Sequence, residues 1–309
     1  MPTNVPSNAS ITRKLFNAAL FTESARIPSF ANLMADTDGK PTIDGKKLKG
    51  QSAPGAPIVR IDDLSSERGD EVTVDIFHQL NQKPVMGDNT LAGKGASLKY
   101  ASDTIGIDQG RTMVDSGGRM SQQRTSHDLS MIARKMLTPY YGRLEDQLCL
   151  IHLAGARGDH SAADWIVPQA NDSDFGEIVV NPITPPTYDR HFFGGDATSI
   201  NSIDGTDLFN LEAIDRLRLA LDEMAYPLQP IRYKDDPVAE ENPFYVMMVT
   251  PRQWYDFWTS TTGDEWRTLQ ARVSERRRDF NHKIFTGDCV MWNNILIKKQ
   301  RRPIRFNAG

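Results

Sequence analysis

The chain has 309 residues, of which 25% are charged and 39% hydrophobic, and its formal net charge is −4. This composition is ordinary for a soluble protein, and the length suffices for one large domain or two interleaved ones. The charge argues against a dedicated nucleic-acid binder, which needs a basic excess, although the chain could line a space that contains DNA. No apolar run approaches the roughly 18 residues of a membrane helix, and no signal peptide is visible, so we expect synthesis in a cytosol.

The first part of the chain is predicted to be largely extended. Residues 1–10 are polar and contain proline, which favours a loose arm. Apolar residues recur at helical spacing within residues 11–26, which predicts a short amphipathic helix that Pro28 ends or bends. Residues 36–57 are rich in glycine, proline and charge, so we interpret them as a linker.

A β-strand and a long excursion follow. Val72, Val74 and Ile76 alternate with other side chains, which indicates a strand. Residues 83–118 contain five glycines before Arg111 and few large apolar side chains, which predicts a long two-stranded ribbon. A ribbon with no sheet or helix beneath it is marginal in water. We therefore expect this one to lie on something else, and a neighbouring subunit is the natural candidate.

The strongest helical periodicity spans residues 121–154. About 34 residues in one helix would extend roughly 50 Å, which makes a strut. Pro139 and Gly142 predict a bend, and Gly155 and Gly158 predict the end. The residues expected on the apolar face are Leu129, Ile132, Met136, Tyr140, Leu144, Leu148 and Ile151.

The second half mixes helices and strands without regular alternation. Residues 159–205 look irregular, and a helix is predicted over 206–225 with Thr206 as a plausible N-cap. The apolar run 244–250 predicts a buried strand, and Pro251 suits the first position of a helix.

Two further elements complete this half. EWRTLQARVSERRR is typical of a helix, and residues 283–299 predict a hairpin that turns at Asn293–Asn294. This order of elements indicates an α+β protein.

Residue patterns that carry chemistry are absent from the sequence. GDNTLAGKGAS, residues 87–97, has the wrong spacing for a phosphate-binding loop and is typical of a flexible loop tip. The six histidines share no metal-ligand spacing, and no Gly-x-Ser-x-Gly elbow occurs. Glu145 and Asp146 are adjacent, so on a helix they diverge by about 100° and cannot act as a pair. Cys149 and Cys289 are expected to be reduced and buried, with a disulfide between them as the alternative.

A dense basic run and an aromatic segment remain. The aromatic side chains between Trp254 and Trp266 are expected to pack in the core. The basic run either forms a solvated helix face balanced by Glu275 and Asp279 or contacts a partner subunit or DNA. Its candidate contact residues are Arg272, Arg276, Arg277 and Arg278.

Three segments together resemble the major capsid proteins of N-four-like podophages. RGDEVTVDIFHQLNQKPVMGDNTLAGKGASLKY carries a Gly-Asp pair, a strand and a PVxGDxxLxGxxxxL loop. The likeness continues through IGIDQGRTMVDSGGRMSQQRTSHDLSMIARKML and RLEDQLCLIHLAGARG, so that it covers residues 68–158. It is weaker at FYVMMVTPRQWYDFW and HKIFTGDCVMWNNILIK.

This resemblance implies an α+β fold of the Hong Kong 97 type. By it, residues 1–65 would form an N-terminal arm, and residues 66–118 the extended loop with its base strands. Residues 119–158 would form the spine helix of the peripheral domain. Residues 159–309 would form the axial domain, with any strands that return to the peripheral domain. Family members often continue further, so this is either a short variant or a chain that lacks a C-terminal piece.

The function that the resemblance implies is structural, with no catalytic, cofactor or metal residues. Copies would assemble into hexamers and pentamers of an icosahedral head that encloses double-stranded DNA, after synthesis in the host bacterial cytoplasm. Portal, scaffolding and cement or decoration proteins would be further partners, and no membrane would be. Loop residues expected to contact a neighbouring subunit are Met86, Asp88, Leu91, Lys94, Leu98, Lys99 and Tyr100.

Alternatives stay open at this point. An encapsulin-like or other virion shell protein would share the fold, and a hydrolase is a more distant alternative. In the best-known member of the fold, a loop lysine joins covalently to an asparagine of a neighbour. Lys94 and Lys99 lie in a comparable loop, but the sequence identifies no acceptor.

Overall fold

The computed structural model covers the chain, and its description is confined to the following residues: 30, 42–43, 46–47, 58, 71–77, 80, 82–159, 165–224, 228, 230–231, 244–280, 283–285 and 287–305. The arm at 1–10 and the helix predicted over 11–26 lie outside these residues, as does most of the linker. Two short paired strands, β1 (Thr42–Ile43) and β2 (Lys46–Lys47), fall within the linker.

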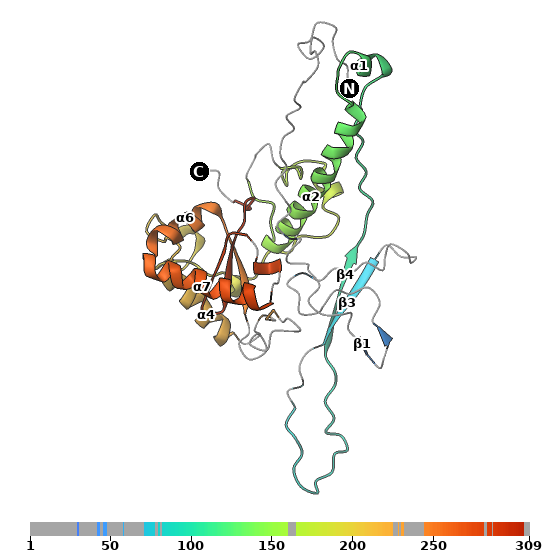
Figure 1. Cartoon of the computed structure of the whole chain (residues 1–309). Helices are drawn as coiled ribbons and strands as arrows, with labels where there is room; N and C mark the ends of the chain where they lie inside the picture. Colours follow the sequence, from blue (N-terminus) through green and yellow to red (C-terminus); the bar gives the residue numbers. More distant parts are fainter. Residues whose placement is uncertain are drawn as a thin grey trace.

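The molecule is elongated, with three parts that Figure 1 shows plainly. A body of sheet and helices contains the second half of the chain. Helix α2 (Leu129–Ala154) leads away from it toward the short helix α1 (Arg119–Gln123). Strands β3 (Glu71–Phe77) and β4 (Tyr100–Gly106) form a ribbon beside the body. The loop that joins these strands extends in the opposite direction from α1.

A three-stranded sheet forms the centre of the body. Its order is β5–β7–β6, where β5 (Tyr245–Val249) runs parallel to β7 (Ile295–Lys299) and β6 (Cys289–Trp292) runs antiparallel to it. The predicted turn is confirmed, because Asn293 and Asn294 have φ of 43° and 58°. Two consecutive left-handed residues, for which asparagine is well suited, define the favoured two-residue hairpin turn.

The predicted hairpin is shorter than expected at its start. Residues Lys283–Phe285 form a 3-10 turn, η5, rather than a strand. Ile284 and Phe285 are both fully buried in the same core. A strand would send two consecutive side chains to opposite faces, whereas a turn lets both point inward.

One face of the sheet is covered by helices α4 (Leu211–Glu223), α6 (Pro251–Ser260) and α7 (Gly263–Phe280). Pro251 occupies the first turn of α6, as predicted, and Thr250 caps it by accepting from Gln253 N. The buried residues between sheet and helices are Ile214, Leu221, Val249, Phe257, Leu269, Val290, Ile295 and Ile297. Alternate residues of β5 and β7 thus face these helices, so the apolar run predicted as a strand is confirmed.

The start of α4 corrects one prediction. Asn210, not Thr206, caps the helix, since its side chain accepts from Ala213 N at 2.9 Å. Thr206 instead bonds to Asp204 Oδ1 through both its backbone N–H and its hydroxyl. Threonine and aspartate compete for backbone groups in this way, which favours a turn over a helix.

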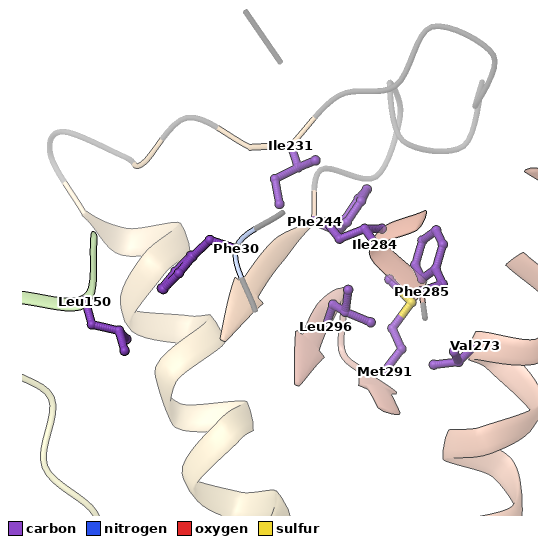
Figure 2. Packing of buried hydrophobic residues seen from close by; sticks show 9 residues of the cluster. All are labelled: Phe30, Leu150, Ile231, Phe244, Val273, Ile284, Phe285, Met291 and Leu296. Atoms are coloured by element: carbon purple, nitrogen blue, oxygen red, sulfur yellow. The ribbon is translucent and has the colours of Figure 1, made fainter. Parts of the chain in front are cut away.

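The opposite face of the sheet packs on a second core, which includes one residue from the N-terminal part of the chain. Phe30 is fully buried, and its N–H donates to Asp146 Oδ1 of α2 at 3.2 Å. Figure 2 shows Phe30 within this core, on the side where Leu150 lies. The buried residues of this second core are Phe30, Leu150, Ile231, Phe244, Val273, Ile284, Phe285, Met291 and Leu296.

Helix α2 is the predicted strut, but it begins eight residues later than expected. Asp128 caps it by accepting from Met131 N at 3.0 Å, and α1 precedes it as a separate turn. The Thr125 hydroxyl accepts from His127 N, so side chains between the two helices bind backbone groups and break the helix. Pro139 lies inside α2, and Gly155 ends it with φ 68°, as predicted.

A third core joins the C-terminal half of α2 to the irregular segment that follows. Ile151, Val167 and Val179 are its buried residues. Gln147 Oε1 accepts from both Ile166 N and Val167 N, which fixes this segment against the helix. The region is irregular as predicted, and its short helices are α3 (Phe175–Ile178), η3 (Tyr188–Arg190) and η4 (Ile200–Ser202).

Candidate assembly interface

The extended loop contacts almost nothing in its own chain. From residue 82 to residue 105, every described side chain is exposed except that of Val85, which is partly covered. Leu91 is 72% exposed, although it is a large apolar residue. The seven predicted contact residues are therefore all exposed: Met86, Asp88, Leu91, Lys94, Leu98, Lys99 and Tyr100. Four of them, Met86, Leu91, Leu98 and Tyr100, are large apolar residues, which makes the loop a candidate interaction surface.

The base of this loop is a regular two-stranded ribbon, whose β4 side chains are exposed from Tyr100 to Ile105. Strands β3 and β4 pair antiparallel over seven residue pairs, from Glu71 with Gly106 to Phe77 with Tyr100. The two-stranded ribbon predicted within residues 83–118 is therefore only partly correct, because one of its strands, β4, lies in that range and its partner, β3, precedes it. A two-stranded ribbon with exposed side chains is at best marginally stable by itself.

Local turns shape the loop even though no core supports it. Gly87 and Gly93 have φ of 67° and 78°, a region that other residues rarely adopt. The Asn89 side chain donates to Met86 O at 2.7 Å, and Lys94 N donates to Leu91 O at 3.0 Å. The glycines of GDNTLAGKGAS therefore form turns at a loop tip, as the sequence predicted.

Helix α2 carries a second apolar surface, which is covered only in part. Its buried residues all belong to its C-terminal half, and none precedes Asp146. Of the seven residues expected on one apolar face, Ile151 is fully buried, Met136 is exposed and the other five are half-buried, so this face is fully covered only near the end of the helix. The first four turns project beyond the body, where the described part of the chain offers no core. On the helix itself Met131 and Met136 are exposed, as are Met113 and Met120 in the segment that precedes it.

The basic run is only partly described. Arg272 is exposed, and its guanidinium lies over the Trp292 ring at 5.2 Å. The side chains of Arg276, Arg277 and Arg278 lie outside the described residues, although their backbone belongs to α7. Within the aromatic segment, Phe257 is fully buried, while Tyr255 and Trp258 are exposed. The core interpretation thus holds for part of that segment.

The cysteines are free, and both are half-buried rather than fully buried as expected. Burial raises the pKa of the Cys149 thiol, and the carboxylates of Asp146 and Glu145 raise it further. Neither Cys149 nor Cys289 therefore belongs to a disulfide in this fold. In the part of the chain that the structure describes, no His, Cys, Asp or Glu side chains are grouped as metal ligands. None of the described helices is long and apolar enough to cross a membrane.

Two anchoring residues were not recognisable in the sequence. Phe30 lies in a segment that looked like a helix end and linker, and its partner Asp146 is 116 residues away. Asn181 lies in the irregular region and binds Gly106, 75 residues away. No periodicity or motif marks either residue, because each contact depends on how distant segments meet.

Comparison with known proteins finds the same architecture in phage capsid proteins. A family model described as phage capsid protein matches residues 4–309. The capsid of Ralstonia phage GP4 has a similar structure, with a TM-score of 0.74 and 27% identity over 98% of this chain and 77% of that chain. The capsid asymmetric unit of cyanophage Pam1 is similar in fold, with a TM-score of 0.58 and 17% identity over 97% of this chain and 76% of that chain. No curated protein sequence is a significant match.

The family match spans nearly the whole chain, so it applies to the ribbon, the strut and the body together. It also accounts for large apolar side chains that are exposed on the projecting loop, among them Met86, Leu91 and Leu98. This chain therefore belongs to the phage capsid protein family: it is a major capsid protein with the Hong Kong 97-type fold, a structural subunit of a bacteriophage head and not an enzyme.

Proposed function

We propose that the extended loop, residues 83–118, lies across an adjacent copy within hexamers and pentamers of an icosahedral head. The exposed apolar side chains of the loop carry this proposal. Contacts that pair one surface with a different surface of the next copy generate closed rings. A long loop buries area on a neighbour without requiring a thick core of its own.

The proposed division of the chain follows the same scheme. Residues 1–65 serve as an arm, 66–118 as the loop with its base strands, and 119–158 as the spine of the peripheral domain. Residues 159–309 form the axial domain. The two cores on either side of the β5–β7–β6 sheet support an axial body, to which Phe30 of the arm and Leu150 of the spine also contribute. The N-terminal half of α2 contains no buried residue, which supports a projecting spine.

The head encloses double-stranded DNA without binding it tightly. A net charge of −4 leaves the shell without the basic excess that holds phosphates. The basic residues of α7 contact either DNA or a partner subunit in this proposal. Portal, scaffolding and cement or decoration proteins complete the particle, the chain is made in the host cytoplasm, and its relatives are the N-four-like podophages.

The test removes the loop and keeps its ribbon. Residues 78–99 are replaced by Asn-Gly, a two-residue turn that closes the strands at the Phe77–Tyr100 pair. We expect a folded subunit that forms few or no shells when expressed particles are counted by negative-stain microscopy. A normal yield of closed shells would contradict the role of the loop.

A single substitution tests the same role of the loop with a smaller change to the chain. Leu91→Asp places a charge at an exposed loop position, so the melting temperature stays unchanged while assembly falls. Leu219→Asp on α4 is the matched control, since Leu219 is 58% exposed. Equal loss of shells in both variants would show that the loop has no special role.

A further inference from the structure

One side chain holds the root of the ribbon. Asn181 Oδ1 accepts from Gly106 N at 2.8 Å, and Asn181 Nδ2 donates to Gly106 O at 3.0 Å. The N–H and C=O of one strand residue point to the same side, so this amide occupies the outer edge of β4 as another strand would. The side-chain amides of asparagine and glutamine carry an acceptor oxygen and a donor nitrogen on neighbouring atoms, which matches the N–H and C=O of one strand residue.

Asn181 itself is firmly placed. Two residues before it, Val179 is buried in the third core, and Ile183 packs against that core two residues after it. The segment then crosses the end of α2 so closely that a Cβ at Gly155 would lie 2.6 Å from Pro185 Cα. Residues 179–186, which we call the strap, are therefore tied to α2 at two points on either side of Asn181.

We propose that Asn181 is a positioning residue that sets the angle between the ribbon and α2, and with it the place where the loop meets the next subunit. The assembly part of this inference rests on the proposed function of the loop. The strap connects the two parts of the molecule that project furthest. The strap packs on the third core through Val179 and Ile183. It binds the ribbon through the side-chain amide of Asn181.

The length of the ribbon makes the angle important. Seven residues of strand extend about 23 Å from the root, and the loop continues beyond them. A change of about 10° in the angle between the ribbon and α2 would displace the far end of β4 by roughly 4 Å, and the loop tip by more. A displacement of that size separates a side chain from its contact, since apolar contacts need approach within about 4.5 Å.

Two measurements on dilute, unassembled full-length subunits test the clamp directly. Hydrogen exchange at the Gly106 amide should become about five-fold faster in Asn181→Ala, which loses both bonds. Electron-spin distances between Ser102→Cys on β4 and Lys135→Cys on α2 should broaden, with Cys149 and Cys289 replaced by serine. Both labelled positions are exposed.

Matched variants separate hydrogen bonding from simple space filling. Asn181→Asp keeps the size and the acceptor but turns an oxygen toward Gly106 O, so it should broaden the distances as much as Asn181→Ala does. A side chain that merely filled space would tolerate this change. Asn201→Ala, at an exposed position in η4, should leave exchange and distances as in the wild type.

Assembly supplies the second readout. With wild-type melting temperature, Asn181→Ala and Asn181→Asp should give fewer closed shells and more irregular particles. Unchanged exchange and distances would overturn the inference and leave the proposed role of the loop intact. Broadened distances with a normal yield of shells would overturn the link between ribbon angle and assembly, and would also count against the proposed function.

Discussion

Single side chains tie the long, thin parts of this subunit to its body. Phe30 fixes the N-terminal segment to the second core, Asn181 fixes the ribbon, and Gln147 fixes the segment after α2. The partners of Phe30 and Asn181 lie 116 and 75 residues away, so each joins segments that are distant in the chain. Gln147 acts on a nearer segment, together with the third core and Arg157.

Phe30 gives the clearest prediction of this kind. Its side chain is 1% exposed, so Phe30→Ala should lower the free energy of unfolding by about 3–5 kcal/mol through lost burial and a residual cavity. Urea unfolding of the unassembled subunit measures the loss. Tyr188→Ala is the control, since Tyr188 is 71% exposed and should cost little. A loss no larger than that of the control would show that Phe30 does not dock in solution.

The buried side chain of Lys298 on β7 should make the free energy of unfolding depend on pH. Its Nζ is buried without a hydrogen-bond partner in the described part of the chain, and burial lowers the pKa of its ammonium, with Cys289 opposing the shift. The unfolded chain holds this proton more tightly than the folded one does. Stability therefore rises with pH between the lowered pKa and the ordinary one, and the penalty is fully present below both.

Removing that charge should stabilise the fold. Lys298→Met should raise the free energy of unfolding by about 1 kcal/mol at neutral pH, because a buried donor without a partner is eliminated. The gain should shrink toward about pH 10, where the unfolded lysine also loses its proton. Urea unfolding at both pH values measures it. Lys299→Met, which removes a partner of Asp288 at 3.7 Å, should bring no gain.

At the scale of elements, local pattern predicted the interiors of helices and strands but not all their starts. Helices α6 and α7, strand β5 and the Asn293–Asn294 turn follow from periodicity and turn chemistry. The starts of α2 and α4 were placed too early, because side chains of Asp128 and Asp204 bind nearby backbone groups and favour turns. Such competition depends on local geometry that hydrophobic spacing does not encode.

The sequence indicated which segment forms the candidate interface. It did not indicate how that segment is anchored to the rest of the chain. Glycine content and a scarcity of large apolar residues indicated a loop without its own core, and residues 82–105 are indeed exposed. The apolar face predicted on α2 is correct as a helix pattern, although only Ile151 near its end is fully buried. Periodicity shows which residues share a face, and it does not show whether that face meets its own chain or another copy.

The end of α2 allows a test at this scale. Gly155 has φ 68°, and a Cβ there would lie 2.8 Å from Thr184 O as well as against Pro185. Gly155→Ala should therefore destabilise the subunit by about 2 kcal/mol or more, from the left-handed backbone and from displacement of the strap. Thermal unfolding measures this loss. Gly176→Ala in α3 is the control, because its added Cβ meets nothing within 4 Å.

At the scale of the whole molecule, the proposed assembly needs one surface that gives a loop and a different surface that receives it. The loop projects in one direction, and α2 with its exposed methionines projects in the other. A subunit with two different contact surfaces joins the next copy head to tail. Such contacts close into a ring when the rotation from one subunit to the next divides a full turn evenly. Each copy would then both give a loop and receive one, so a defect in one surface leaves the other available.

This division predicts dominant interference in mixed assemblies. A subunit whose residues 78–99 are replaced by Asn-Gly retains the receiving surface, so it should enter rings beside wild-type copies and leave a gap. If a ring of six needs every loop, random mixing at equal amounts leaves roughly 2% of rings intact. Co-expression at graded ratios, followed by counts of closed shells, should therefore show a yield that falls far more steeply than the wild-type fraction. A yield proportional to that fraction would mean that altered subunits are excluded, and that the loop is needed to join a ring at all.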